Sequence, residues 1–221
     1  MSSDRFLTRK EVLSILGFRR VLTEEQVVCC WNKVIKERRG NYSRELESNK
    51  GTNVFYSEKS ILEISKRKMW RLVFDPGFSL VQMRDILGKE CGRNLRFCRE
   101  NNWWLENPYV LKKRKPNYIL IGLSPRFCNL KWEEQEERID SSFYRASVSL
   151  ALNTAVSFFL LRNSYFLDSF SHWGTEQDDK KTKCAVRLKK GGCIFLFNRK
   201  IDWPDPSLGV FLVKEFDKNP I

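Results

Sequence analysis

Apolar residues at helical spacing predict short, capped helices in the first half of the chain. Thr8 and Glu11 form a capping box ahead of an apolar stripe that ends at Gly17, which predicts a helix from Thr8 to that glycine. A second box over residues 23–26 opens a helix that is expected to end near residue 40. Each helix has one apolar side, which is expected to be buried.

The opening pattern of the first helix recurs later in the chain. Ser57 is expected to cap a third helix, after a short strand over residues 54–56. Ser79, Gln82 and Gly88 then repeat the cap, the N3 acceptor and the terminating glycine of the first helix. The repeat indicates two related helical modules.

Basic residues follow the second module at regular spacing. A helix is expected over residues 94–101, and it would place Arg93, Arg96 and Arg99 on one side. Such a face, with Asn94 beside it, suits a recognition helix, because Arg and Asn bind base edges in the major groove.

A basic hairpin is predicted next. The runs 109–111 and 118–121 are β-prone, and a polar Pro–Asn turn separates them. The tip would carry four consecutive cations, Lys112, Lys113, Arg114 and Lys115. Cations at a hairpin tip suit contact with phosphates, as in the wing of a winged helix.

The second half of the chain contains a long apolar run. It predicts a central helix that starts at Ser141 or Ser142 and continues to Leu160. Residues 131–139 ahead of it are acidic and helix-prone.

The end of the chain predicts β-structure. The alternating run 183–190, the glycines 191–192 and the apolar run 193–197 predict a hairpin, and residues 208–216 predict another strand. Residues 164–182 are polar and indicate no regular element. This half is therefore expected to be a small antiparallel sheet packed on the long helix.

These elements predict an α+β fold in three parts. Residues 1–72 would form a helix-turn-helix-like module, and residues 73–123 a second module with the basic hairpin as its wing. Residues 124–221 would form an α+β domain for a protein partner, a homodimer contact or a ligand.

The charge of the chain is positive and unevenly placed. Among 221 residues, 40 are Lys or Arg and 27 are Asp or Glu, a net charge of +13. Residues 1–123 carry +11 of this charge, and residues 124–221 carry only +2. A one-sided excess of this size favours a polyanionic partner.

The composition excludes several kinds of chemistry. A single histidine cannot supply a multi-histidine metal site, and no glycine-rich phosphate loop or zinc-protease motif occurs, so no cofactor, metal or catalytic residue is expected. The seven cysteines are irregularly spaced, which indicates free thiols in a cytoplasmic protein. No signal-peptide pattern and no membrane-spanning run is found.

The first module also resembles a known family. The run Phe6 to Gly17 and the strand, cap and helix over residues 55–62 are similar to the winged helix-turn-helix domains of the excisionase and MerR-like families. The resemblance covers residues 6–64 and implies a DNA-binding module.

We therefore expect a non-catalytic protein that binds duplex DNA, as a transcriptional regulator or a DNA-processing accessory factor. The residues expected to contact DNA all lie in the basic half and should converge on one face. They are Arg19, Arg20, Lys36, Arg39, Arg93, Asn94, Arg96, Arg99, Lys112, Lys113, Arg114 and Lys115.

Three alternatives stay open. The same charges suit an RNA-binding or ribosome-associated protein, and the aromatic residues of the run 103–109 would then stack on unpaired bases rather than fill the core. Asp168 and the fragment 178–180 offer carboxylates and a lysine to a metal-dependent nuclease. The basic half would also suit docking on an acidic protein.

Overall fold

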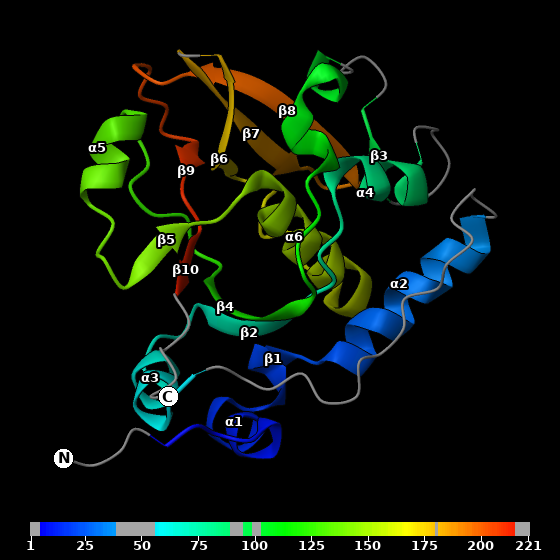
Figure 1. The fold of residues 1–221 in the computed structure, drawn as a ribbon, viewed down its shortest axis with the longest axis vertical. Helices are drawn as coiled ribbons and strands as arrows, with labels where there is room; N and C mark the ends of the chain where they lie inside the picture. Colours follow the sequence, from blue (N-terminus) through cyan, green and yellow to red (C-terminus); the bar gives the residue numbers. More distant parts are fainter. Residues whose placement is uncertain (1–4, 39–55, 89–94, 99–102, 180, 215–221) are drawn as a thin grey trace.

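Helices and strands alternate along the chain. The structure is a computed structural model and describes residues 5–38, 56–88, 95–98, 103–179 and 181–214 (Figure 1). Within these ranges the α-helices are α1 (Arg9–Leu16), α2 (Glu24–Arg38), α3 (Glu58–Ser65), α4 (Leu80–Leu87), α5 (Trp132–Glu137) and α6 (Val148–Arg162). Short 3-10 helices span Phe18–Arg20, Trp103–Glu106 and Pro108–Leu111. The strands are β1 (Val21–Leu22), β2 (Trp70–Asp75), β3 (Arg96–Phe97), β4 (Asn117–Gly122), β5 (Phe143–Arg145), β6 (Ser171–Asp179), β7 (Thr182–Leu188), β8 (Cys193–Lys200), β9 (Leu208–Gly209) and β10 (Leu212–Lys214).

These strands form two five-stranded sheets. The strand order is β1-β2-β4-β10-β5 in the first sheet and β3-β8-β7-β6-β9 in the second. Both sheets are mixed, because β1 runs parallel to β2, β3 to β8 and β9 to β6, while the other pairs are antiparallel. The α+β class predicted from the sequence is confirmed.

Helix α6 lies between the two sheets (Figure 1). Its residues from Val148 to Phe158 are all buried, so every side of the helix is covered. Trp31 of α2 also reaches it, and the indole Nε1 donates a hydrogen bond to Ser157 Oγ at 3.0 Å. The predicted central helix is therefore present, but it starts later than expected, because residues 143–145 pair with β10 as strand β5.

The capped helices of the first half form where the sequence predicts them. Complete capping boxes begin at Thr8 for α1 and at Ser79 for α4, and Ser57 caps α3. Gly17 and Gly88 end α1 and α4 with φ values of +78° and +76°, which glycine adopts without steric strain. The repeated helix pattern is thus confirmed as local structure. Of the strand predicted just before Ser57, two residues lie outside the described ranges.

Two elements of the second predicted module are wrong. Residues 96–97 form β3, parallel to β8, where the sequence predicts part of a recognition helix. Pro108–Leu111 is a 3-10 helix, and β4 pairs with β2 and β10, so the predicted basic hairpin does not form. In both places, partners distant in the sequence replace the local structure that the pattern favours.

Strands from both halves of the chain share each sheet. The first sheet joins β1, β2 and β4 with β10 and β5, and β3 forms an edge of the second sheet. The sheet predicted for the second half as antiparallel is therefore mixed and includes a strand from the first half. The boundary predicted between residues 72 and 73 falls within β2. A continuous apolar core extends from Leu7 to Val213.

The second sheet contains one hairpin that the sequence predicts and one strand that it misses. Strands β7 and β8 pair antiparallel on either side of Gly191 and Gly192, whose φ values are +90° and +81°. Strand β6 lies within residues 164–182, which were expected to be irregular, and it pairs with β7. Helix α5 forms within the predicted acidic segment 131–139.

Candidate nucleic-acid interface

The two predicted arginines after α1 have different surroundings. Arg19 is exposed. The guanidinium of Arg20 donates hydrogen bonds of 2.7–3.2 Å to four carbonyl oxygens, those of Ile64, Ser65, Arg67 and Trp70. The last carbonyls of a helix lack intrahelical partners, and Arg20 adds donors to two of them, Ile64 and Ser65 of α3. Arg20 therefore joins α3 to the start of β2.

The four consecutive cations at residues 112–115 also differ in their surroundings. Arg114 donates from Nε and Nη2 to the buried carboxylate of Asp75 at 2.9 and 3.1 Å, and its Nη1 donates to two serines near the start of α6, Ser147 and Ser149. Lys112, Lys113 and Lys115 are exposed. Arg114 thus anchors the segment, and the three lysines remain accessible to a partner.

The other predicted residues that the structure describes do not gather on one face. Lys36 is exposed on α2, and Arg96 is half-buried in β3. Figure 1 places β3 near the top of the molecule, whereas Arg19 lies between α1 and β1 at the bottom. Arg39, Arg93, Asn94 and Arg99 lie outside the described ranges.

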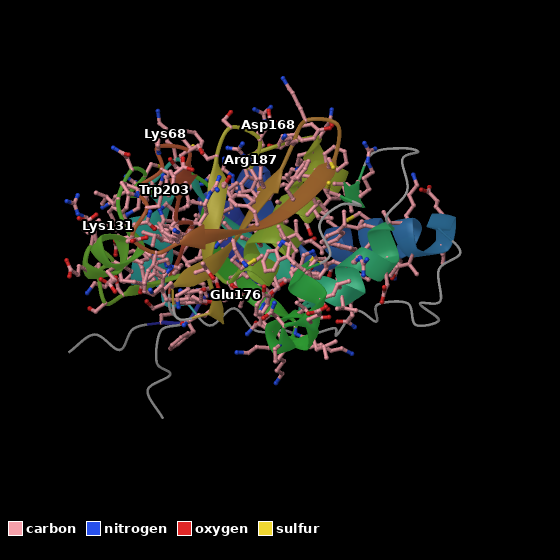
Figure 2. The ribbon with its side chains drawn as sticks, turned by 90° about the horizontal axis from the view of Figure 1, so that it is seen from above. Lys68, Lys131, Asp168, Glu176, Arg187 and Trp203 are labelled. Carbon is pink, nitrogen blue, oxygen red and sulfur yellow. The ribbon has the colours of Figure 1, made fainter. Side chains whose placement is uncertain are left out.

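A basic and aromatic surface lies instead on the outer face of the second sheet. Side chains alternate along the hairpin β7–β8, and Val186 and Leu196 belong to the core around α6. Alternate residues of the hairpin face away from α6, and we call five of them the sheet-face cluster: Arg187, Lys189, Phe195, Phe197 and Arg199. Phe197 is partly buried, because it also packs against the small cluster of Trp173, Ala185 and Leu208. Figure 2 looks onto this side of the molecule and labels Arg187.

Strand pairing places cations next to rings in this cluster. Arg187 lies directly opposite Phe195 on the neighbouring strand. The ammonium of Lys189 is 4.5 Å from the centre of the Phe195 ring, and the guanidinium carbon of Arg199 is 5.0 Å from the centre of the Phe197 ring. These distances are typical of cation–π contacts.

The cluster lines a shallow cavity of about 200 Å³, together with Ser171 and Ser207. Three cations and no carboxylate contribute to this lining. Outside the lining, the carboxylate of Asp205 lies 3.9 Å from Arg199 Nε and accepts hydrogen bonds from the backbone and side chain of Ser207. The surface of the cavity is therefore positive.

Arg187 is the central cation of this surface. Its guanidinium has no hydrogen-bond or ion-pair partner among the residues that the structure describes, and its Nε is buried. A buried donor without a partner costs about 1–3 kcal/mol. An oxygen acceptor bound in the cavity would relieve this cost, so the site is suited to a phosphate or a base carbonyl.

The sequence-based prediction missed the sheet-face cluster. Its signal is the alternation over residues 187–199, in which positions 187, 189, 195, 197 and 199 are cations or aromatic residues. The alternation predicts a hairpin, but it does not reveal which side of the hairpin is left uncovered. The charge excess of residues 1–123 points to the other half of the chain.

The acidic residues considered for a nuclease have other partners or are not described. The carboxylate of Asp168 accepts a hydrogen bond from the backbone nitrogen of Lys190 at 2.7 Å. The side chains of residues 178–179 and all of residue 180 lie outside the described part of the chain. Within that part, no three His, Cys, Asp or Glu side chains form a group that could hold a metal ion.

His172, the single histidine, has a structural role. Its Nε2 donates to the carbonyl oxygen of Ala146 at 2.8 Å, and its Nδ1 accepts from the backbone nitrogen of Phe211 at 3.1 Å. Complete burial lowers the pKa of His172 to about 3, so the ring is neutral at neutral pH.

Comparisons with known proteins add no relative: no protein-family model matches the sequence, and neither a curated protein nor a solved structure is significantly similar to it. None of the helices in the described ranges is long and apolar enough to cross a membrane. The cysteines within those ranges are free thiols, as expected. The candidate interface is therefore defined by geometry and charge alone.

Proposed function

We propose that the protein binds nucleic acid, and that the outer face of the second sheet holds a single-stranded segment. The observation that carries the proposal is the sheet-face cluster, in which cationic groups lie beside two phenylalanine rings on paired strands. Cations bind backbone phosphates and rings stack on unpaired bases, so one surface offers both kinds of contact.

Two properties favour a single strand over a duplex. Rings on a sheet face can stack on unpaired bases, whereas the bases of a duplex are already stacked on one another. Recognition in the major groove commonly uses a helix with exposed cations, and Arg96, which was expected on such a helix, belongs to a strand. Both RNA and single-stranded DNA fit this proposal, and duplex DNA is the competing outcome.

Fluorescence anisotropy with a labelled pyrimidine oligonucleotide of about twelve nucleotides tests the proposal, with RNA, single-stranded DNA and duplex forms compared. The protein is expected to bind the single strands more tightly, and the affinity should fall as salt rises. Phe195→Ala should weaken binding about tenfold, because stacking on an aromatic side chain contributes about 1–3 kcal/mol per base. Arg187→Gln should weaken binding and reduce the salt dependence.

Control variants separate this surface from the one predicted by the sequence. Lys59→Gln removes an exposed charge from α3 and should leave the affinity unchanged. Replacing Lys112, Lys113 and Lys115 together by Gln tests the lysine segment. If the triple variant loses affinity and the Phe195 and Arg187 variants keep it, the sheet face is not the nucleic-acid binding site.

Two further outcomes would contradict the proposal. Tighter binding to the duplex than to either single strand would restore the hypothesis of a duplex DNA-binding protein. Absence of binding to every nucleic acid at low salt would exclude nucleic-acid binding as the function and favour docking on an acidic protein.

A further inference from the structure

A second cavity lies where three strands of the first sheet end. Trp70 begins β2, Gly122 ends β4 and Leu212 begins β10, and all three line this cavity. Its volume is about 280 Å³, near the lower limit for pockets that bind small molecules. We call it the strand-end cavity.

Aromatic side chains form one wall of the strand-end cavity. The rings of Trp70 and Phe143 are 5.2 Å apart between centres and are inclined by 45°. Gly122 lies against the indole, and a Cβ there would be 3.2 Å from a ring carbon of Trp70. The missing side chain lets the indole pack over β4 and leaves an apolar wall that suits a planar ring.

Three arginines give the same cavity a positive charge. Arg67 is held by Glu63, with Nη2 2.7 Å from the carboxylate, and its guanidinium lies 5.4 Å from the centre of the Phe143 ring. The side chains of Arg126 and Arg138 have no hydrogen-bond or ion-pair partner among the described residues. Two guanidinium groups are therefore available to a ligand.

One carboxylate, that of Asp140, also lines the cavity and offsets one of the three positive charges. It accepts hydrogen bonds from the backbone nitrogen and the hydroxyl of Ser142 at 2.8 and 2.7 Å. These bonds keep the pKa of Asp140 below its usual value. With three arginines and one aspartate in the lining, the excess charge is positive.

We propose that the strand-end cavity binds a small organic anion that carries a planar ring, such as a nucleoside monophosphate. The ring lies against Trp70 and Phe143, and the anionic group accepts hydrogen bonds from Arg126 and Arg138, whose planar guanidinium groups match phosphate and carboxylate oxygens. The volume admits one ring and one anionic group, which excludes dinucleotide cofactors. This inference does not depend on the proposed nucleic-acid binding.

Isothermal titration calorimetry with four probes tests the inference: adenosine monophosphate, benzoate, adenosine and inorganic phosphate. The two ring-bearing anions should bind, and adenosine and phosphate should each bind at least about tenfold more weakly, because each lacks one of the two interactions. The tighter of the two anions identifies phosphate or carboxylate as the preferred group.

Substitutions in the cavity should remove this binding. Arg126→Gln and Arg138→Gln alter exposed residues, so the variants are expected to fold. Each should weaken the affinity for the ring-bearing anions about tenfold. Arg19→Gln alters an exposed arginine that does not line the cavity, and it is the matched control. Arg187→Gln should leave anion binding unchanged, because it alters only the outer face of the second sheet.

Three results would overturn the inference. They are the absence of binding for both ring-bearing anions at millimolar concentration, equal affinity for inorganic phosphate alone, and unchanged binding in both cavity variants. Loss of anion binding in Arg187→Gln would place the anion site on the second sheet and would exclude the strand-end cavity as that site.

Discussion

Neighbouring cationic side chains differ in what they contact. Arg19 is exposed, whereas Arg20 binds carbonyl oxygens at the end of α3. Arg114 binds buried Asp75, while Lys113 beside it faces solvent. The sequence predicted all four as nucleic-acid contacts, because residue type and spacing do not show which cation has an internal acceptor.

Arg20 and Arg19 form a matched pair for a stability test. Arg20→Ala should lower the free energy of unfolding by about 2 kcal/mol, because it removes charged donors from the carbonyls that follow α3. Arg19→Ala should change the free energy by less than about 0.5 kcal/mol, as expected for an exposed residue. Urea denaturation measures both, and equal effects would show that the Arg20 contacts contribute nothing.

At the scale of elements, local signals were sufficient for some predictions and misleading for others. The capped helices and the hairpin around Gly191 and Gly192 form as predicted, because their caps and turn bonds join residues close in the chain. Residues 96–97 and 108–111 differ, because their conformation depends on pairing and packing with distant segments. Strand β6 was missed for a different reason: its sequence is polar, although its partner β7 follows directly in the chain.

The contact between β6 and the start of α6 requires a glycine. A Cβ at Gly174 would lie 2.3 Å from Val148 Cγ2 and 2.9 Å from the Val148 backbone nitrogen. Gly174→Ala should therefore lower the free energy of unfolding by about 1–3 kcal/mol, because the strand and helix must move apart. Thr175→Ala, the exposed neighbour, is the control in the same urea titration. A Gly174 variant as stable as the control would contradict this close approach.

At the scale of the whole molecule, α6 and His172 connect the two sheets. Helix α6 contacts strands of both, and His172 on β6 binds backbone groups that adjoin β5 and β10 of the first sheet. The three predicted domains stay a prediction, but strands from all three parts of the chain pair within the first sheet. The main core, which is shared by both sheets, favours cooperative unfolding.

The buried neutral His172 should make stability depend on pH. The pKa of His172 is lowered to about 3 in the fold from an ordinary value near 6.5, so below pH 6.5 the unfolded chain binds a proton that the folded chain does not. The free energy of unfolding should therefore fall as pH decreases from 6.5, with a slope that approaches about 1.4 kcal/mol per pH unit.

Urea titrations between pH 7 and pH 5.5 measure this slope, because no other histidine titrates there. His172→Gln should be less stable at pH 7 but should lose the slope. A slope unchanged in that variant would assign the pH dependence to other groups.

The sequence by itself determined the α+β class, the capped helices, the glycine turn and the positive charge, since these depend on composition and on interactions between near neighbours. The tertiary structure decided which cations are bound internally, which strands share a sheet and which face of the second sheet stays open. Those properties depend on pairs such as Arg114 with Asp75 and Arg187 with Phe195. No local pattern specifies such pairs, because their members become neighbours only when the whole core assembles.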